Sequence, residues 1–256
     1  MSRRRFFAPP DAFKQKTVTL TSDEAKHLRD VLRLKQGDEV YVFDGAGKEF
    51  RCVVSDWKRD EVTLVECEQV APPHLESPLD LTLAVALLKG DKFDLVVQKA
   101  TELGITRIVP VMTRHADIHL RDAPDGEKRV NRWRRIALEA AKQCGRARVP
   151  DVHMPEEFAE LIPTAGDSLR VMFSEREGRS LEEVIVDSVA QGRQVKAHRT
   201  SVTALVGSEG GWANDEITAA SDSGWHIVTL GGRILRAETA AITVSVLLQH
   251  TFGDLK

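Results

Sequence analysis

Two glycine-rich segments toward the C-terminal end carry the residues whose types and spacing could do chemistry. They read Leu205-Val-Gly-Ser-Glu-Gly-Gly-Trp212 and Leu230-Gly-Gly-Arg-Ile-Leu-Arg-Ala-Glu-Thr-Ala-Ala-Ile242. Each passes from an apolar stretch through glycines to the start of a predicted helix. Glycine leaves backbone N–H and C=O groups uncovered, so two such turns side by side can bind the edge of a flat ligand. A third turn, Phe173-Ser-Glu175, follows another apolar stretch and is expected to complete this pocket.

Arg236 and Glu238 directly follow the second turn and are the predicted catalytic residues. A guanidinium can hold oxygen atoms that gain negative charge during a reaction, and a carboxylate can exchange a proton. An ion pair that caps the following helix is the structural alternative for these two residues. His27 could act as a base near neutral pH, but it precedes the pocket by a long stretch of chain. The identity of the general base is left open at this point.

Residues 1–73 are predicted to form a small β-rich domain. Alternation of apolar and polar residues predicts strands over 16–20, 39–43, 49–57 and 61–66. Thr21 and Glu24 have the spacing of a capping box at the start of a helix. The apolar residues expected on one face of that helix are Ala25, Leu28, Val31 and Leu32. The segment 70–74 contains Pro-Pro, which can continue neither a strand nor a helix, and is the predicted linker.

In residues 74–256 predicted strands alternate with predicted helices. The strands are expected over 79–88, 106–112, 169–173, 202–206 and 226–230. The helices are expected over 91–103, 128–144, 181–190, 214–221 and 236–252. This alternation predicts an α/β domain with a mostly parallel sheet that helices cover on both faces. The pattern alone gives no reason to expect a knot, because knots are rare in proteins.

The two glycine segments resemble those of the SPOUT superfamily of RNA methyltransferases. Within it the best match is the family that methylates N3 of a uridine in 16S ribosomal RNA. That family has Gly-Pro-Glu-Gly-Gly followed by Leu-Gly-x-Arg-Ile-Leu-Arg-x-Glu-Thr-Ala, and Ser208 replaces its proline here. Other motifs that resemble the family occur in the same order at 27–34, 42–45, 89–92, 101–104 and 139–146. The match is specific because these separated motifs occur in register.

The resemblance implies a fold, a cofactor and partners. The fold is a SPOUT-type, trefoil-knotted α/β domain preceded by a PUA-like β-barrel that binds RNA. The cofactor is S-adenosyl-L-methionine, and the partners are 16S rRNA and a second copy of the chain, with the last helix near the dimer interface. The implied cofactor-binding residues are Phe173, Ser174, Leu205, Val206, Gly207, Glu209, Gly211, Leu230, Gly231, Ile234 and Leu235. The implied RNA-binding residues are Arg5, His27, Arg33, Lys92, Gln143 and Arg146.

Two other functions keep the same fold. The chain could be a ribosome assembly factor that binds RNA without catalysis, although intact cofactor turns speak against this. It could also methylate a ribose 2′-OH, a reaction of other SPOUT families that carry different C-terminal motifs. Cofactor titration distinguishes an assembly factor without catalysis from an enzyme. Nucleoside mass spectrometry distinguishes ribose 2′-O-methylation from methylation of uracil N3.

Composition bounds these possibilities. The chain has 256 residues, a formal net charge of −3 and 42% hydrophobic residues, as in ordinary globular proteins. The longest apolar run, 79–88, is too short to span a membrane, and we expect a cytoplasmic protein without membrane contact. Cys52, Cys67 and Cys144 are expected to be reduced thiols, and no metal site is expected. Between residues 114 and 148, ten Lys and Arg stand against five Asp and Glu, a local excess suited to a polyanion.

Overall fold

The computed structural model describes residues 3–58, 60–116, 118, 120, 122–163, 168–176, 178–190 and 200–256. The chain divides into two compact units: Met1–Glu76 with Leu138–Val149, and Ser77–Ala137 with Pro150–Lys256. The division between them falls inside one long helix, so the N-terminal unit includes a segment from the middle of the sequence. The boundary expected at residues 73 and 74 stays a prediction about where the two domains separate in sequence.

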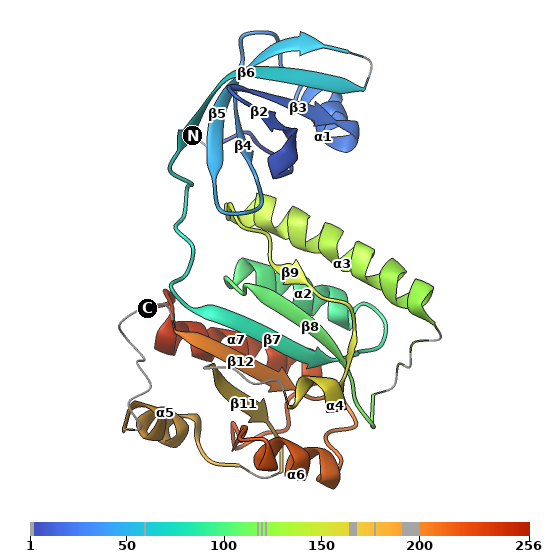
Figure 1. The fold of residues 1–256 in the computed structure, drawn as a ribbon, viewed down its shortest axis with the longest axis vertical. Coiled ribbons are helices and arrows are strands. Elements are labelled where there is room, and N and C mark those ends of the chain that lie inside the picture. The colour runs from blue at the N-terminus through green and yellow to red at the C-terminus, as the bar shows by residue number, and fades with distance from the viewer. Residues whose placement is uncertain are drawn as a thin grey trace. The chain divides into compact units, whose positions relative to one another are not determined.

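The N-terminal unit is built on a curled six-stranded sheet (Figure 1). Its strands are β1 (Arg5–Phe7), β2 (Phe13–Lys14), β3 (Thr17–Thr21), β4 (Glu39–Phe43), β5 (Glu49–Trp57) and β6 (Glu61–Val70). They lie in the order β1-β4-β5-β6-β3-β2, and β1 pairs with β4 in parallel whereas the other pairs are antiparallel. The alternating side chains of these strands, such as Val40, Val42 and Leu64, form the core of this unit.

Cys52 on β5 and Cys67 on β6 form a disulfide, with their Cα atoms 4.2 Å apart. The prediction of reduced thiols is therefore wrong for this pair, whereas Cys144 is a free cysteine. The two strands shift register just after Arg51, and this bulge brings Cys52 across from Cys67. The spacing of cysteines in a sequence does not reveal such a shift in strand pairing.

Helix α1 (Ser22–Lys26) begins where the sequence predicts, but the capping box is not formed. The Thr21 side chain makes no capping hydrogen bond. The Glu24 carboxylate instead accepts hydrogen bonds from the Phe7 backbone N–H and from the Lys142 ammonium. A long-range ion pair has therefore replaced the local cap.

The chain then continues as a π-helical turn, η2 (His27–Val31). A π-helical turn contains more residues than an α-helical turn, so it rotates the side chains that follow around the helix axis. Ala25 and Leu28 are buried as expected, but Val31 and Leu32 are 68% and 39% exposed. The expectation that these four apolar residues share one face of a single helix therefore does not hold for Val31 and Leu32.

The second unit is a parallel sheet with helices on both faces (Figure 1). Its strands are β7 (Asp80–Ala86), β8 (Arg107–Met112), β9 (Asp151–Val152), β10 (Glu156–Glu157), β11 (Leu169–Phe173), β12 (Ser201–Val206) and β13 (His226–Val228). The order is β10-β8-β7-β12-β11-β13, with β9 beside β8, and every described pair is parallel. This confirms the expected α/β class. The implied knot stays a prediction, because strand order does not show that the chain threads a loop.

The helices of this unit follow the predicted positions, except that α3 begins five residues earlier than predicted and the short α4 was not predicted. They are α2 (Lys92–Glu102), α3 (Ala123–Cys144), α4 (Phe158–Leu161), α5 (Leu181–Ala190), α6 (Asn214–Asp222) and α7 (Ala237–Phe252). Helices α4 and α6 pack on one sheet face with Met172 and Leu205. Because side chains alternate along a strand, the other half of them point to the opposite sheet face. On that face α7 contacts β7, β12 and α2. No described helix is long and apolar enough to cross a bilayer.

Candidate functional site

A cavity of about 240 Å³ lies at the carboxyl ends of β11, β12 and β13. In a parallel sheet the carboxyl ends of neighbouring strands meet at one edge, where α/β proteins commonly bind ligands. The three predicted turns meet here. The predicted cofactor-binding residues that line the cavity are Phe173, Ser174, Val206, Gly207, Leu230, Gly231, Ile234 and Leu235.

Trp212 holds two of these turns together. Its indole is buried and donates a hydrogen bond from Nε1 to the Phe173 carbonyl over 2.8 Å. A Cβ added to Gly207 would lie 2.9 Å from the indole Cε2, which is closer than side chains approach one another. Gly207 is therefore required by the indole beside it, and the indole in turn fixes the end of β11 against the turn after β12.

The other three predicted cofactor residues lie elsewhere. Leu205 is buried in the core on the α4 and α6 side of the sheet. Gly211 has a φ of +68°, and a Cβ there would lie 2.5 Å from Oε1 of Glu175, so it packs against a cavity residue. Glu209 forms an ion pair with Lys92 outside the cavity. Their assignment to the cofactor stays a prediction.

Some residues that line the cavity were not assigned to the cofactor from the sequence. These are Glu175, Ser208, Trp212, Thr229, Gly232, Arg233, Ala237 and Ala240. All but Thr229 lie inside the three quoted segments, and Thr229 directly precedes the second glycine-rich segment. Glu175 and Arg233 place one negative and one positive side chain around the same cavity.

Ser208 replaces the proline of the resembling motif and has a structural role. Its hydroxyl donates a hydrogen bond to the His115 carbonyl over 2.9 Å. A proline could not make this bond. The serine thus ties the turn after β12 to the segment that follows β8.

A second hollow of about 420 Å³ adjoins the cavity. It is lined by Lys92, Glu209, Ile234, Leu235 and Arg236. Ile234 and Leu235 line both spaces, so the second glycine turn forms the wall between them. Ile234 is 84% exposed and lines both hollows, so a ligand in either one can cover it.

Arg236 and Glu238 lie at the start of α7, where the sequence places them. Arg236 is the N-cap residue, but its side chain makes no capping hydrogen bond. Among the residues that the structure describes, the two side chains form no ion pair with each other. Glu238 lines neither hollow, and its Oε2 is buried without a partner among the described residues. The helix-cap ion pair, the structural alternative, is therefore not formed.

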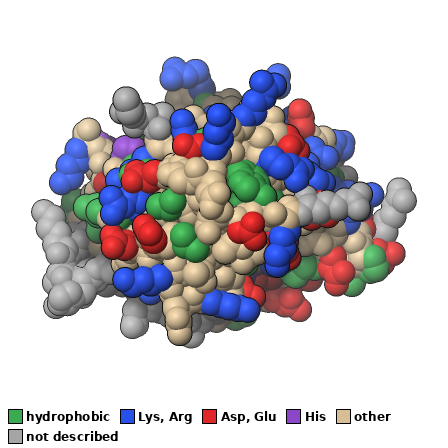
Figure 2. All heavy atoms as spheres, turned by 90° about the horizontal axis from the view of Figure 1, so that it is seen from above, with side chains coloured by type: hydrophobic (Ala, Val, Ile, Leu, Met, Phe, Trp, Pro, Cys, Tyr) green, Lys and Arg blue, Asp and Glu red, His purple; other side chains and the backbone are tan. Residues whose placement is uncertain are grey.

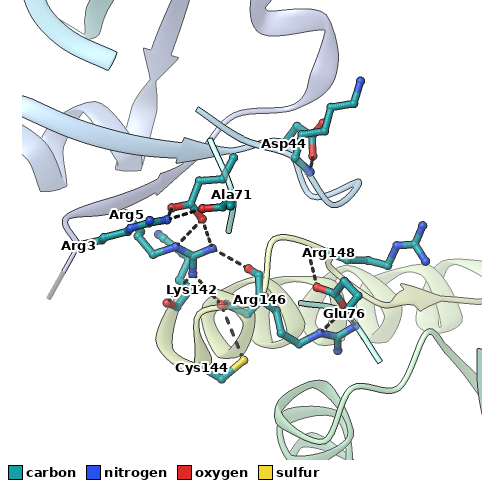
Figure 3. A network of polar contacts seen from close by, with 12 residues as sticks. Arg3, Arg5, Asp44, Ala71, Glu76, Lys142, Cys144, Arg146 and Arg148 are labelled. Carbon is teal, nitrogen blue, oxygen red and sulfur yellow. Dashed lines mark hydrogen bonds and ion pairs between the residues drawn. The ribbon is translucent and has the colours of Figure 1, made fainter. Parts of the chain in front are cut away.

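Two of the predicted RNA-binding residues, Arg5 and Arg146, lie in a polar network in the N-terminal unit (Figure 3). Arg5 donates to Glu49 over 2.9 and 3.1 Å and to three backbone carbonyls within 141–146. Arg146 pairs with Glu76 over 2.9 Å. The side chains of Arg5 and Arg146 are 7% and 8% exposed. The guanidinium groups of Arg5 and Arg146 hold the end of α3 in this unit. Neither arginine can contact phosphate without breaking its ion pair with Glu49 or Glu76.

Lys142 adds a further link in this network. Its ammonium pairs with Glu24 over 2.5 Å and with Glu139 over 3.3 Å. Burial lowers the pKa of the Lys142 ammonium, but the hydrogen bond and charge of Glu24, with those of Glu139, outweigh it and leave the pKa raised. The ion pair therefore persists throughout the neutral pH range.

The remaining predicted RNA-binding residues have accessible side chains. His27 and Arg33 are exposed at and just after the π-helical turn, and Gln143 is exposed near the end of α3. Lys92 is half-buried in its pair with Glu209. Figure 2 shows Lys and Arg side chains interspersed with Asp and Glu on the face that it presents. RNA contact on that face would therefore depend on particular side chains rather than on one uninterrupted basic surface.

The basic stretch 114–148 is partly neutralised by acidic residues from elsewhere in the chain. Arg132 pairs with Asp94, and Arg114 pairs with Asp215 over 2.6 Å. Trp133, which lies in this stretch, is buried against Phe93 with ring centroids 4.3 Å apart, so its indole is not open for stacking on an RNA base. Arg121 lies outside the described residues. The excess of positive charge in the sequence therefore overstates the charge available to RNA.

Known proteins resemble both parts of the chain. A family model described as an RNA methyltransferase domain matches residues 75–249, and one described as an RNA methyltransferase PUA domain matches residues 20–67. Proteins named ribosomal RNA small subunit methyltransferase E are among the relatives. The one from Synechocystis sp. is 33% identical over 240 residues, or 92% of this chain and 74% of the relative. The one from Bacillus subtilis is 30% identical over 231 residues, or 88% and 87%.

Solved structures share the whole architecture. A putative methyltransferase from Legionella pneumophila, in complex with its bound cofactor SAM, has a TM-score of 0.86 to this structure. Ribosomal RNA small subunit methyltransferase E from Neisseria gonorrhoeae, bound to S-adenosyl methionine, has a TM-score of 0.85. Each is 28% identical, and each match covers all of both chains.

Proposed function

Because the chain belongs to the ribosomal RNA small subunit methyltransferase E family, we propose that it methylates N3 of one uridine in 16S rRNA. Membership makes it an S-adenosylmethionine-dependent rRNA methyltransferase, and the choice of N3 is the finer proposal. The observation that carries the proposal is the cavity built from three turns at the ends of β11, β12 and β13. Its wall carries the Leu-Gly-x-Arg-Ile-Leu-Arg-x-Glu-Thr-Ala segment that resembles the N3-specific family.

The residues of the cavity fit S-adenosylmethionine. When bound, this cofactor supplies an electrophilic methyl group on a sulfonium. The uncovered backbone of the glycine turns can pair with the edge of its adenine. Glu175 and Arg233 line the same cavity, and their opposite charges suit the ammonium and carboxylate of its amino acid end. The exposed Ile234 offers apolar surface that the ligand can cover.

The second hollow suits the uracil of the acceptor. N3 lies on the Watson–Crick edge of uracil, so the base must be unpaired or flipped out before it can react. Arg236 lines the hollow and can hold uracil O2 or O4 as the ring becomes an anion. The buried Oε2 of Glu238 can accept a hydrogen bond from Arg236 and orient it. Ile234 and Leu235 line both spaces, so an acceptor in the hollow lies beside the cofactor at this turn.

We also propose the quaternary structure and the knot that the resemblance implies. On α7, Val244 and Leu248 are buried, whereas Ile242 and Leu247 are half-buried and Val246 is exposed. The apolar side chains that remain accessible support a homodimer interface along this helix. Light scattering of the full chain at micromolar concentration should give twice the monomer mass. We place the reaction in the cytoplasm, where ribosomal subunits are assembled.

RNA recognition in the N-terminal unit is proposed to involve the π-helical turn. Arg33→Ala should weaken binding to 16S rRNA and flatten its salt dependence, because each lost phosphate contact reduces the slope by roughly 0.7–0.9 units. Filter binding across a series of salt concentrations measures this slope. Arg51→Ala is the matched control, because Arg51 is exposed in the same unit but faces Glu39 and Glu68. An Arg33→Ala slope equal to that of the control contradicts a phosphate contact.

Arg146→Ala, by contrast, should act mainly on folding. Its side chain is paired with Glu76, and its removal leaves the partly buried Glu76 carboxylate with the Arg148 backbone N–H but without its charged partner. We therefore expect a lower unfolding temperature for this variant. If Arg146→Ala changes RNA affinity without changing the unfolding temperature, the result would support the predicted contact between Arg146 and RNA.

The proposed reaction is tested by the nucleosides of its product. Small ribosomal subunits from cells that lack the enzyme are incubated with the protein and S-adenosylmethionine, and the digested rRNA is analysed by mass spectrometry. The proposal expects 3-methyluridine. A 2′-O-methyl nucleoside would identify a ribose methyltransferase. Cofactor titration and RNA binding without any product would identify an assembly factor that binds RNA without catalysis.

A further inference from the structure

We infer that Glu209 is the proton acceptor of the methyl transfer and that Lys92 controls it by moving from the Glu209 carboxylate to an oxygen of the uracil. This inference rests on the proposed function and supplies the general base that the sequence leaves open. It moves Glu209, one of the predicted cofactor residues, to the acceptor side of the site. It also gives Lys92 a role in the reaction beyond contact with RNA.

The ion pair lies where the acceptor must enter. Lys92 begins α2, Glu209 lies in the turn after β12, and their charged groups are in direct contact. Both line the second hollow with Arg236, and neither lines the cavity assigned to the cofactor. Their side chains are partly exposed, at 28% and 39%, so a ligand can reach them from solvent. The pair therefore faces the acceptor rather than the cofactor.

The balance of charge in the hollow suits a neutral base that becomes an anion. Among the described residues that line it, Lys92 and Arg236 are cationic and Glu209 is anionic. His115 lies against the same turn, since a Cβ on Gly210 would be 2.8 Å from the His115 Cβ. A uracil anion whose proton has passed to Glu209 would face two cations and a neutral carboxylic acid. The single negative charge then lies on the uracil between two cations, and the sum of charges in the hollow is the same before and after the transfer.

Movement of the Lys92 ammonium drives the proton in one direction. The N3–H of uracil is a far weaker acid than a carboxylic acid, so transfer to a carboxylate is unfavourable in water. An ammonium beside a carboxylate weakens that carboxylate as a base, and an ammonium beside the uracil oxygen stabilises the uracil anion. When Lys92 leaves Glu209 for O4 or O2, both effects favour proton transfer from N3 to Glu209. One side chain therefore changes the proton affinities of donor and acceptor together.

The step balances in atoms and charge. The N3–H bond breaks, its electron pair stays on N3, and the proton goes to a Glu209 oxygen. The N3 lone pair forms the new N–C bond as the S–C bond breaks, and the electron pair of the S–C bond returns to sulfur, which becomes neutral. Glu209 then releases its proton to solvent, and the Lys92 ion pair forms again.

The test is a set of single-turnover measurements on small ribosomal subunits that lack the modification. Glu209→Gln should lower the rate about 10²–10³-fold, as loss of a general base typically does. Affinity for S-adenosylhomocysteine, measured by calorimetry, should stay within about twofold. In this variant the proton must pass to hydroxide, so the rate should rise about tenfold per pH unit, whereas the wild-type profile should be flatter.

A charge-swapped variant separates catalysis from structure. Lys92→Glu combined with Glu209→Lys keeps an ion pair at this place but moves the carboxylate to α2. The double variant should fold and bind S-adenosylhomocysteine yet remain impaired at least about 10²-fold. The matched control is Lys99→Met with Glu102→Gln, which removes a Lys–Glu pair of 2.8 Å from the same helix. It should keep the wild-type rate.

Two results would overturn the inference. The first is recovery of the wild-type rate by the charge-swapped variant, which would make the pair structural. The second is a Glu209→Gln variant with the wild-type rate and pH profile. Either leaves the proposed function intact, because the wild-type protein still forms 3-methyluridine. A wild-type protein that forms none overturns the proposed function and the inference with it.

Discussion

Arg236→Ala is expected to lower the single-turnover rate of uracil methylation about 10²–10³-fold, the usual effect of removing one aimed charge from a water-poor site. Affinities for S-adenosylhomocysteine and for small ribosomal subunits should change little. The structure supports this division because the Arg236 side chain makes no capping hydrogen bond and lines the hollow beside the cofactor cavity. Its loss should remove stabilisation of the uracil anion rather than the start of α7.

Two further measurements define the role of Arg236. Arg236→Lys should restore only part of the rate. An ammonium cannot reproduce the two-pronged guanidinium group, which can bridge a uracil oxygen and a carboxylate such as Glu238. Raising the pH should partly rescue Arg236→Ala, since more uracil is then ionised without help. Arg179→Ala is the control, because Arg179 is an equally charged residue of the same unit that pairs with Asp187 over 2.7 Å. A variant that unfolds or loses cofactor binding would make Arg236 a structural residue.

The order of helices and strands could be predicted from the sequence because hydrophobic periodicity reports local structure. The strand over 169–173 and the helix over 181–190 agree with β11 and α5 residue for residue. Very short elements such as β9 and β10 were missed, because a strand of two residues is too short to show alternation of apolar and polar side chains. They form only because β8 offers an edge to pair with.

Features that depend on distant parts of the chain could not be predicted. The disulfide between Cys52 and Cys67 depends on a register shift between β5 and β6. Val31 is exposed at the end of a π-helical turn, and Glu24 pairs with the distant Lys142 rather than with the start of α1. A sequence pattern shows which residues are apolar or charged, but not which partner each will meet.

The same limit applies to the candidate site. Glycine turns after apolar strands predicted a backbone-lined cavity, and the structure brings all three turns to one sheet edge. The ion pair between Lys92 and Glu209 could not be foreseen, because Lys92 begins α2 and Glu209 lies in the turn after β12, far apart in the sequence. Arg5 and Arg146 illustrate the converse. The resemblance assigns both to RNA, but in the structure they pair with Glu49 and Glu76, and their contact with RNA stays a prediction.

Gly207→Val is expected to weaken binding of S-adenosylmethionine at least about 100-fold, equal to about 2.8 kcal/mol. The sequence suggests that the new side chain would fill the ligand's space, but the structure gives a different first cause. A Cβ at this position would lie 2.9 Å from the Trp212 indole. The indole must shift, and its hydrogen bond to the Phe173 carbonyl, which holds the end of β11, would be strained or broken. Calorimetry with S-adenosylhomocysteine measures the loss.

Gly231→Val should weaken binding for another reason. Nothing lies within 4 Å of a Cβ at Gly231, but its φ is +69°, where a side chain costs roughly 1–2 kcal/mol and a branched one more. The turn would relax away from the conformation that lines the cavity. Gly37→Val is the matched control, since Gly37 also has open space and a positive φ of +88° but belongs to the N-terminal unit. It should lose similar stability and keep cofactor affinity.

Addition of Trp212→Phe should recover part of the binding lost in Gly207→Val and none of that lost in Gly231→Val. Equal recovery in both, or unchanged affinity in both single variants, would remove the cofactor from these turns.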